Sequence, residues 1–71
     1  MTTIAYTNAD ALRIALLASG LAENETRCVS NRLEDGFFRI DVRTPYQAYE
    51  FYVDGESGEV AGLNAEPMTL S

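Results

Sequence analysis

The length of 71 residues allows a single domain, residues 1–71, and the 46% hydrophobic and 23% charged residues are typical of a folded globular protein. This composition excludes a disordered tail and a membrane protein. The chain contains no His and no Lys, which removes the commonest general base and the Schiff-base nucleophile, so we predict that it is not an enzyme.

A helix is predicted over residues 8–19. Thr7 and Asp10 have the spacing of a capping box, and Gly20 is placed to end the helix in the left-handed conformation. One face of the helix is apolar and wide enough to require a sheet to pack on. This face consists of Ala11, Ile14, Ala15 and Ala18, is widened by Leu12 and Leu16, and is extended at its far end by Leu17 and Leu21.

Four strands are predicted after the helix, because apolar and polar residues alternate there between turn signals. Short connections favour antiparallel pairing between neighbours in the sequence. The predicted fold class is therefore α+β, with one α-helix packed on a three- to four-stranded antiparallel β-sheet and with Leu16, Ile40, Phe51 and Val53 buried. The predicted strands cover residues 26–33, 37–44, 48–54 and 59–63, and residues 64–71 are predicted to form a tail.

Two local features are candidates for a reactive or metal-binding site. Cys28 is the only cysteine, which excludes an internal disulfide, and with no His to activate it we predict a buried structural thiol. Asp54, Glu56 and Glu59 place three carboxylates in one loop, but the spacing of a calcium loop is not met. We expect this loop to be a plain hairpin turn, in which Gly55 and Gly58 supply positive φ angles, and we predict no metal, no cofactor and no catalytic residue.

Charge is unevenly distributed. Residues 1–44 carry six acids and all five arginines, for a net charge of −1, whereas residues 45–71 carry five acids and no base, for a net charge of −5. A chain with a total of −6 is expected to bind a basic protein surface and not to bind nucleic acid directly. The predicted partner-binding residues are Glu50, Tyr52, Asp54, Glu56 and Glu59, with Tyr52 as an aromatic anchor.

Plain alternatives remain for these residues. One alternative is that the acids form only a solvated strand face and an acidic turn, which is what charge runs usually are. Arg39 and Arg43 are expected on the open face of the sheet, opposite Glu50 and Asp54, where exposed cross-strand ion pairs stabilise little. Phe37 is expected on the same open face, and Tyr49 in the core.

Two segments resemble PepSY-type domains. The run DALRIALLASG at residues 10–20 resembles the family's helix, A-x-x-I-A-L-x-x-A-G, and YEFYVDGESGEV at residues 49–60 resembles its closing hairpin, Y-x-Y-x-V-D-A-x-T-G-E-V. The strand at residues 37–42 lies where the family has its middle strand, and the likeness covers residues 8–63. It implies a non-enzymatic α+β module that inhibits peptidases or binds protein segments at the bacterial cell envelope.

These observations lead to two functional hypotheses. The first is a small acidic inhibitor that binds and blocks a nuclease or effector complex of bacterial defence through its basic nucleic-acid-binding surface. Phage-encoded anti-CRISPR proteins are similar in size and charge only. The alternative is the PepSY-type module, with a peptidase as partner. The N-terminus has no basic segment followed by an apolar run, so we expect a cytoplasmic protein without membrane insertion, the alternative being an exported mature domain.

Overall fold

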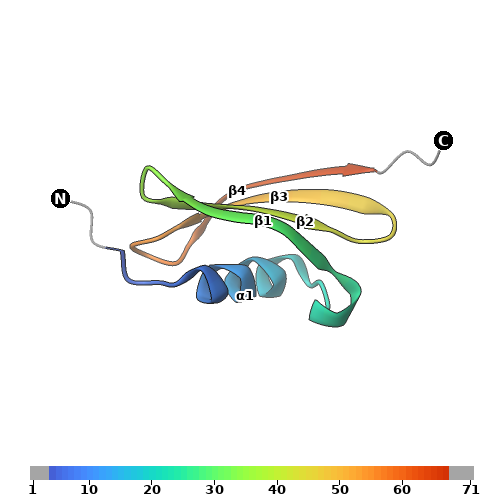
Figure 1. The fold of residues 1–71 in the computed structure, drawn as a ribbon, viewed down its shortest axis with the longest axis horizontal. Helices are drawn as coiled ribbons and strands as arrows, with labels where there is room; N and C mark the ends of the chain where they lie inside the picture. The colour runs from blue at the N-terminus through green and yellow to red at the C-terminus, as the bar shows by residue number, and fades with distance from the viewer. Residues whose placement is uncertain (1–3, 68–71) are drawn as a thin grey trace.

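One helix and a four-stranded antiparallel sheet form the fold, as the sequence predicts (Figure 1). The computed structural model describes residues 4–67. The strands are paired in sequence order, β1-β2-β3-β4, so β1 and β4 are the two edges. The elements are α1 Asn8–Ser19, the short 3-10 helix η1 Glu23–Glu25, β1 Arg27–Glu34, β2 Phe37–Arg43, β3 Gln47–Asp54 and β4 Val60–Pro67.

The predicted helix ends are confirmed. The backbone N–H of Asp10 donates to Oγ1 of Thr7 at 3.1 Å, and the N–H of Thr7 donates to Oδ2 of Asp10 at 3.1 Å, which completes the capping box. The hydrogen bond from the Thr7 N–H to the carboxylate, helped by the Thr7 side chain, lowers the pKa of Asp10. Gly20 ends the helix at a φ of 71°, in the left-handed region.

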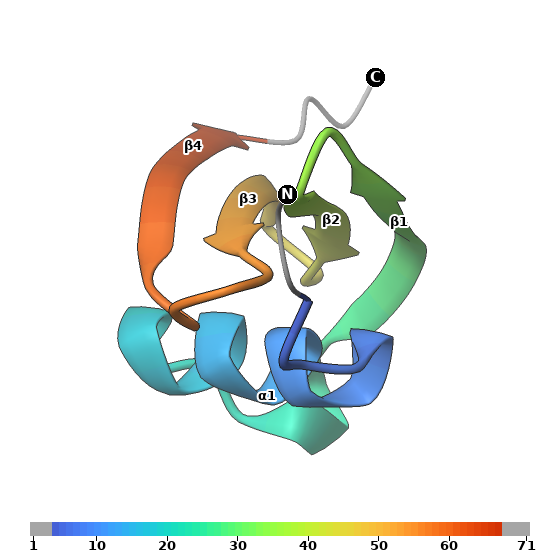
Figure 2. The same cartoon turned by 90° about the vertical axis from the view of Figure 1, so that its left-hand side faces the viewer.

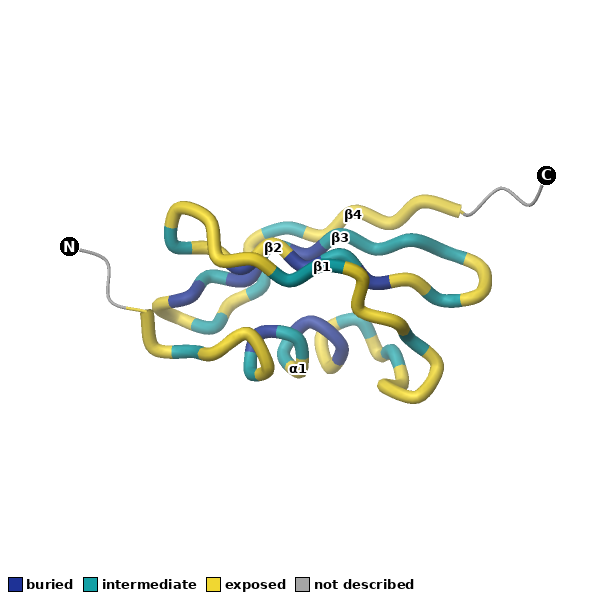
Figure 3. Tube along the Cα trace, viewed as in Figure 1, coloured by how far each residue is buried: buried dark blue, intermediate teal, exposed yellow. Residues whose placement is uncertain are grey.

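The core lies between α1 and one face of the sheet, where the buried positions follow the alternation of β2 and β3 (Figure 3). The prediction that Leu16, Ile40, Phe51 and Val53 are buried is confirmed, and Tyr49 packs against the core in part. The buried hydrophobic residues are Ala11, Ala15, Leu16, Phe38, Ile40, Val42, Phe51 and Val53.

The last turn of the helix differs from the prediction. Ala18 is exposed and Leu17 is 76% exposed, although both were expected on the apolar face. The helix crosses beneath the sheet, with its first turn on the side of β1 and its last turn on the side of β4 (Figure 2). The last turn therefore reaches the edge of the sheet, where only Leu16 and Leu21 still pack against the core.

A β-bulge in β1 changes which of its side chains share a face of the sheet. Cys28 pairs with Val42 and Asn31 pairs with Ile40, so the register shifts between Cys28 and Ser30. Directly opposed residues share a face, so Cys28 and Asn31 lie on the helix side although strict alternation separates them. Cys28 is nevertheless exposed, because β1 is an edge strand, and the prediction of a buried thiol is wrong.

Strand β4 is longer than predicted, because Val60–Pro67 pairs with β3 as far as Gln47 opposite Pro67. Residues 64–67 are thus part of the sheet and not of a tail, while residues 68–71 lie outside the described residues. The small side chains of this segment give a weak alternating pattern, which hides the strand in the sequence. A proline is tolerated at the end of β4 because the strand is at an edge.

The turn between β3 and β4 meets the N-terminal segment. The N–H of Ala5 donates to the carbonyl of Gly55 at 2.8 Å, and the N–H of Gly55 donates to the carbonyl of Gly36 at 2.9 Å. Gly58 has a φ of 77°, as expected, but Gly55 is not among the residues with positive φ. Gly55 is buried where three segments meet, so close approach and not a left-handed backbone requires a glycine there.

Candidate functional site: the open face of the sheet

The face of the sheet away from the helix separates its charges by strand. Ile40 and Val42 are buried on the helix side, so Arg39 and Arg43 lie on the open face, and each has another arginine directly opposite it in β1. The open face of β1 and β2 thus carries four of the five arginines: Arg27, Arg32, Arg39 and Arg43. The same face of β3 and β4 carries Glu50, Asp54 and Glu66 and no base.

We call these two parts the arginine half and the acidic half. Like charges directly opposite each other in a sheet are destabilising, so the pairs Arg27–Arg43 and Arg32–Arg39 weaken the contact between β1 and β2. The arginine half also contains two acids: Asp41 lies between Arg39 and Arg43 in β2, and Glu34 lies opposite Phe37 at the end of β1. The open face is therefore divided by charge along a line between β2 and β3.

A hydrogen-bond network around Glu50 joins the two halves. Arg39 donates from Nη2 to Oε2 of Glu50 at 2.8 Å, in the one ion pair that residues 4–67 contain. Tyr52 donates its hydroxyl to Oε1 of Glu50 at 3.1 Å, and Asn64 donates Nδ2 to the same oxygen at 3.4 Å. The predicted pairing of Arg39 with Glu50 is confirmed, whereas Arg43 and Asp54 form no ion pair within the described residues.

The network changes the acid–base behaviour of its members. The bond from Arg39, helped by the bond from Tyr52, holds the pKa of Glu50 below its ordinary value. The same carboxylate raises the pKa of Arg39 and of Tyr52. Arg39 is charged and the Tyr52 hydroxyl is protonated at neutral pH even without these pKa shifts, and the hydrogen bonds to Glu50 favour both states further. The bond from the Tyr52 hydroxyl to Glu50 also restrains the ring over the sheet.

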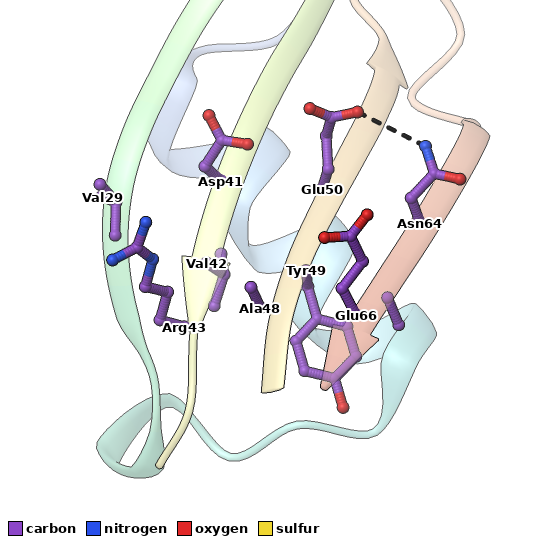
Figure 4. Close-up of a pocket in the computed structure, with 10 residues that line it drawn as sticks. Val29, Asp41, Val42, Arg43, Ala48, Tyr49, Glu50, Asn64 and Glu66 are labelled. Atoms are coloured by element: carbon purple, nitrogen blue, oxygen red, sulfur yellow. Dashed lines mark hydrogen bonds between the residues drawn. The ribbon is translucent and has the colours of Figure 1, made fainter. Parts of the chain in front are cut away.

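A shallow hollow of about 380 Å³ lies beside this network (Figure 4). Its middle is occupied by the small side chain of Ala48, which pairs with Arg43 on one side and Glu66 on the other. Asp41, Glu50 and Asn64 form the next row across the strands, with Asn64 bonded to Glu50 in Figure 4. Three carboxylates and one guanidinium surround the hollow, so its rim favours a cationic group.

Asp54 has a structural role in the turn after β3. Its Oδ1 accepts hydrogen bonds from the backbone N–H groups of Glu56 at 2.8 Å and of Ser57 at 3.2 Å. The N–H of Asp54 donates to the carbonyl of Glu59 at 2.8 Å, which closes the hairpin. The carboxylate of Asp54 thus holds the turn, while Glu56 and Glu59 are exposed.

The five predicted partner-binding residues are therefore spread over two places. Glu50 and Tyr52 belong to the network on the open face, and Asp54, Glu56 and Glu59 belong to the turn beyond it. The sequence interpretation missed Asn64 and Glu66, because it assigned them to a tail. The alternation of Leu63 and Ala65 with these polar residues is the signal that identifies them as a strand.

Phe37 lies on the open face opposite Asp54 and is 37% exposed, as the alternation predicts. Within residues 4–67, no group of three or more His, Cys, Asp or Glu side chains is arranged to hold a metal ion. No helix in the described part of the chain is long and apolar enough to cross a membrane.

No protein-family model, no curated protein and no solved structure matches this chain. The resemblance to PepSY domains therefore rests on the residues quoted above and stays a prediction. The geometry and charge of the open face and of the turn after β3 are therefore the features that indicate a function.

Proposed function

We propose that this chain is a non-enzymatic inhibitor protein that binds and blocks a partner protein through the partner's basic surface. The observation that carries the proposal is the division of charge on the sheet. The acidic half and the adjoining turn contain five acids and no base, whereas four of the five arginines lie on the open face of β1 and β2. A surface of one sign attracts a partner of the opposite sign and increases the rate of association.

The geometry gives the predicted residues different roles. Glu56 and Glu59 are exposed in a turn whose backbone Asp54 holds in place, so they are available for a partner's cations without rearrangement. Glu50 holds the hydroxyl of Tyr52, which fixes the aromatic ring on the open face. Tyrosine is among the residues enriched at the energetic centres of protein interfaces, which supports Tyr52 as the anchor.

We further infer that the target is a surface that binds nucleic acid. A basic surface that otherwise holds nucleic acid, in a nuclease or effector complex of bacterial defence, has the charge that this acidic half complements. The inhibitor would then compete with nucleic acid for one surface, as expected for an anti-CRISPR-like protein. Blocking a surface in this way requires no catalytic residue.

The experiment is affinity capture from bacterial lysate with matched charge reversals. Glu56→Lys/Glu59→Lys changes the acidic turn, and Glu23→Lys/Glu25→Lys changes the charge by the same amount in η1, at the opposite end of the molecule (Figure 1). Wild type and the η1 variant should retain a basic protein that the turn variant loses, and added nucleic acid should displace it. Equal loss in both variants, or retention that nucleic acid does not affect, would refute the proposal.

A further inference from the structure

The two edges of the sheet differ in charge. Three of the eight residues of β1 are charged, and β1 is also tied to the helix, because Nδ2 of Asn31 donates to the carbonyl of Asn8 at 2.8 Å. β4 has eight residues of which only Glu66 is charged, and most of the others are small or apolar. Proteins normally protect edge strands with charges, because their free backbone groups pair with other chains. β4 lacks this protection over residues 62–65.

The two sides of β4 differ in chemistry. Leu63 pairs with the buried Phe51 and so lies on the helix side, where it is 48% exposed, and Ala65 lies on the same side next to it. Gly62, Asn64 and Glu66 lie on the open face. A further strand beside β4 would therefore meet apolar side chains on one side and the acidic half on the other.

The ring of Tyr52 extends this recognition surface toward the edge. A Cβ added at Gly62 would lie 3.3 Å from Cδ2 of Tyr52, so the ring rests over Gly62, which is directly opposite it. The hydroxyl bond to Glu50 holds the ring there. A cation on the open face beside Gly62 would contact the face of the ring, and one beside Glu66 would form an ion pair.

We propose that the free edge of β4 takes up an extended segment of the partner as a fifth strand, and that this segment alternates apolar and basic residues. Its apolar side chains cover Leu63 on the helix side, and its basic side chains lie on the open face between Tyr52 and Glu66. The segment is directed to β4 and away from β1, because β1 presents Arg27 and Arg32 on that face. Backbone hydrogen bonds supply affinity, and alternate side chains supply specificity.

The inference rests on the proposed function, because it names the part of the basic partner that is bound. The proposed function and the proposed strand addition can nevertheless be refuted separately. Capture through the acidic turn depends on Glu56 and Glu59, whereas strand addition depends on Leu63 and on the free backbone of β4. If the partner is still captured but no segment pairs with β4, the inhibitor proposal stands and only the proposal of strand addition is refuted.

The test uses a short fluorescent peptide in which lysine and valine alternate, with binding measured by fluorescence polarisation at low salt. Two related peptides are the controls: a block peptide of the same composition, and the alternating peptide with methylated backbone nitrogens that cannot pair as a strand. The alternating peptide should bind at least about tenfold more tightly than either. Equal binding of the block or methylated peptide would show attraction by charge alone and overturn the proposal.

A matched pair of variants tests whether the peptide pairs with β4 or with β1. Leu63→Lys places a charge on the helix side of β4, and Leu33→Lys does the same on β1, where Leu33 is 47% exposed and Leu63 is 48% exposed. Both variants should keep the wild-type unfolding temperature within a few degrees. Only Leu63→Lys should weaken binding of the alternating peptide, by about tenfold or more. Equal effects of both, or none from Leu63→Lys, would contradict the proposal.

A second copy of the chain is the competing occupant of this edge. Sedimentation velocity of the wild-type protein distinguishes the two, because pairing between copies would give a dimer that Leu63→Lys dissociates. We expect a monomer at the concentrations of the peptide assay, since each copy carries a net charge of −6. A dimer that Leu63→Lys abolishes would assign the edge to self-association and overturn the assignment to a partner segment.

Discussion

Replacing Gly55 by Ala should destabilise the protein through close contact at the turn after β3. A Cβ at this position would lie 2.9 Å from Cδ1 of Ile4, 3.0 Å from the carbonyl oxygen of Gly36 and 3.3 Å from Cε2 of Phe38. The Ile4 side chain has room to rotate, but the Gly36 oxygen is backbone and accepts the hydrogen bond from the Gly55 N–H at 2.9 Å. Relief of the contact therefore lengthens or breaks that bond.

The expected size follows from two opposing effects. Overpacking of this kind costs about 1–3 kcal/mol, and the smaller entropy of the unfolded chain with Ala in place of Gly returns about 0.4–1 kcal/mol. The net loss is about 1–2 kcal/mol, which lowers the unfolding temperature of a domain this size by about 4–16 °C. Thermal unfolding, monitored by circular dichroism, measures this decrease in the unfolding temperature.

Gly62→Ala is the matched control. Its added Cβ would meet only the Tyr52 side chain, with Cδ2 nearest at 3.3 Å, and a side chain moves more easily than a carbonyl group. We expect it to unfold within a few degrees of wild type, and the double variant Ile4→Ala/Gly55→Ala to regain little of the lost stability. If Gly55→Ala unfolds at the same temperature as Gly62→Ala, the reasoning about this contact is wrong.

Three further predictions concern the network, the helix cap and the thiol. Because Arg39 lowers the pKa of Glu50 from its ordinary 4.5, the stabilisation by this carboxylate is present above that value and lost as pH falls through the lowered one. Glu50→Gln should thus be less stable than wild type at pH 7 in urea unfolding, with a difference that narrows below about pH 4; a constant difference would argue against the network. Thr7→Ala should cost about 0.5–2 kcal/mol in the same assay, with Thr7→Ser near wild type. Cys28→Ser should change stability by less than about 0.5 kcal/mol, and partial burial, which raises the pKa of Cys28, should shift the pH midpoint of its alkylation above that of a free cysteine.

The parts of the fold that sequence patterns predict well are those with strong local signals. Thr7, Asp10 and Gly20 define the helix ends through hydrogen bonds that depend on residues close in sequence. Strands β2 and β3 are central and buried on one side, so their apolar residues alternate strictly and reveal both the strands and the core.

The bounds of β1 are predicted to within one residue, but the facing of its side chains and the length of β4 are not, for a physical reason. β1 and β4 each have one side without a neighbour, so burial constrains their sequences less and the alternation is weak. The bulge after Cys28 also reverses the phase of β1, which no simple period of two can represent. Because β4 was predicted too short, Asn64 and Glu66 were missing from the predicted site.

The charge division of the open face follows from the pairing of strands. The sequence shows that residues 45–71 lack bases, which predicts an acidic hairpin. It does not show that Arg32 faces Arg39, which depends on the register set by the turn between β1 and β2, or that Arg27 faces Arg43, which depends on the shift at the bulge. Nor does it show that Asp54 is used inside the turn, since that depends on the backbone geometry of residues 54–59.

The central claim is that the acidic turn recognises a basic partner, and association kinetics test it most directly. The protein retained in the capture experiment is immobilised, and surface plasmon resonance is recorded at low and at physiological salt. Glu56→Lys/Glu59→Lys should slow association and flatten its salt dependence, while Glu23→Lys/Glu25→Lys should leave both close to wild type. Association rates that fall equally in the two variants, or in neither, would contradict the claim.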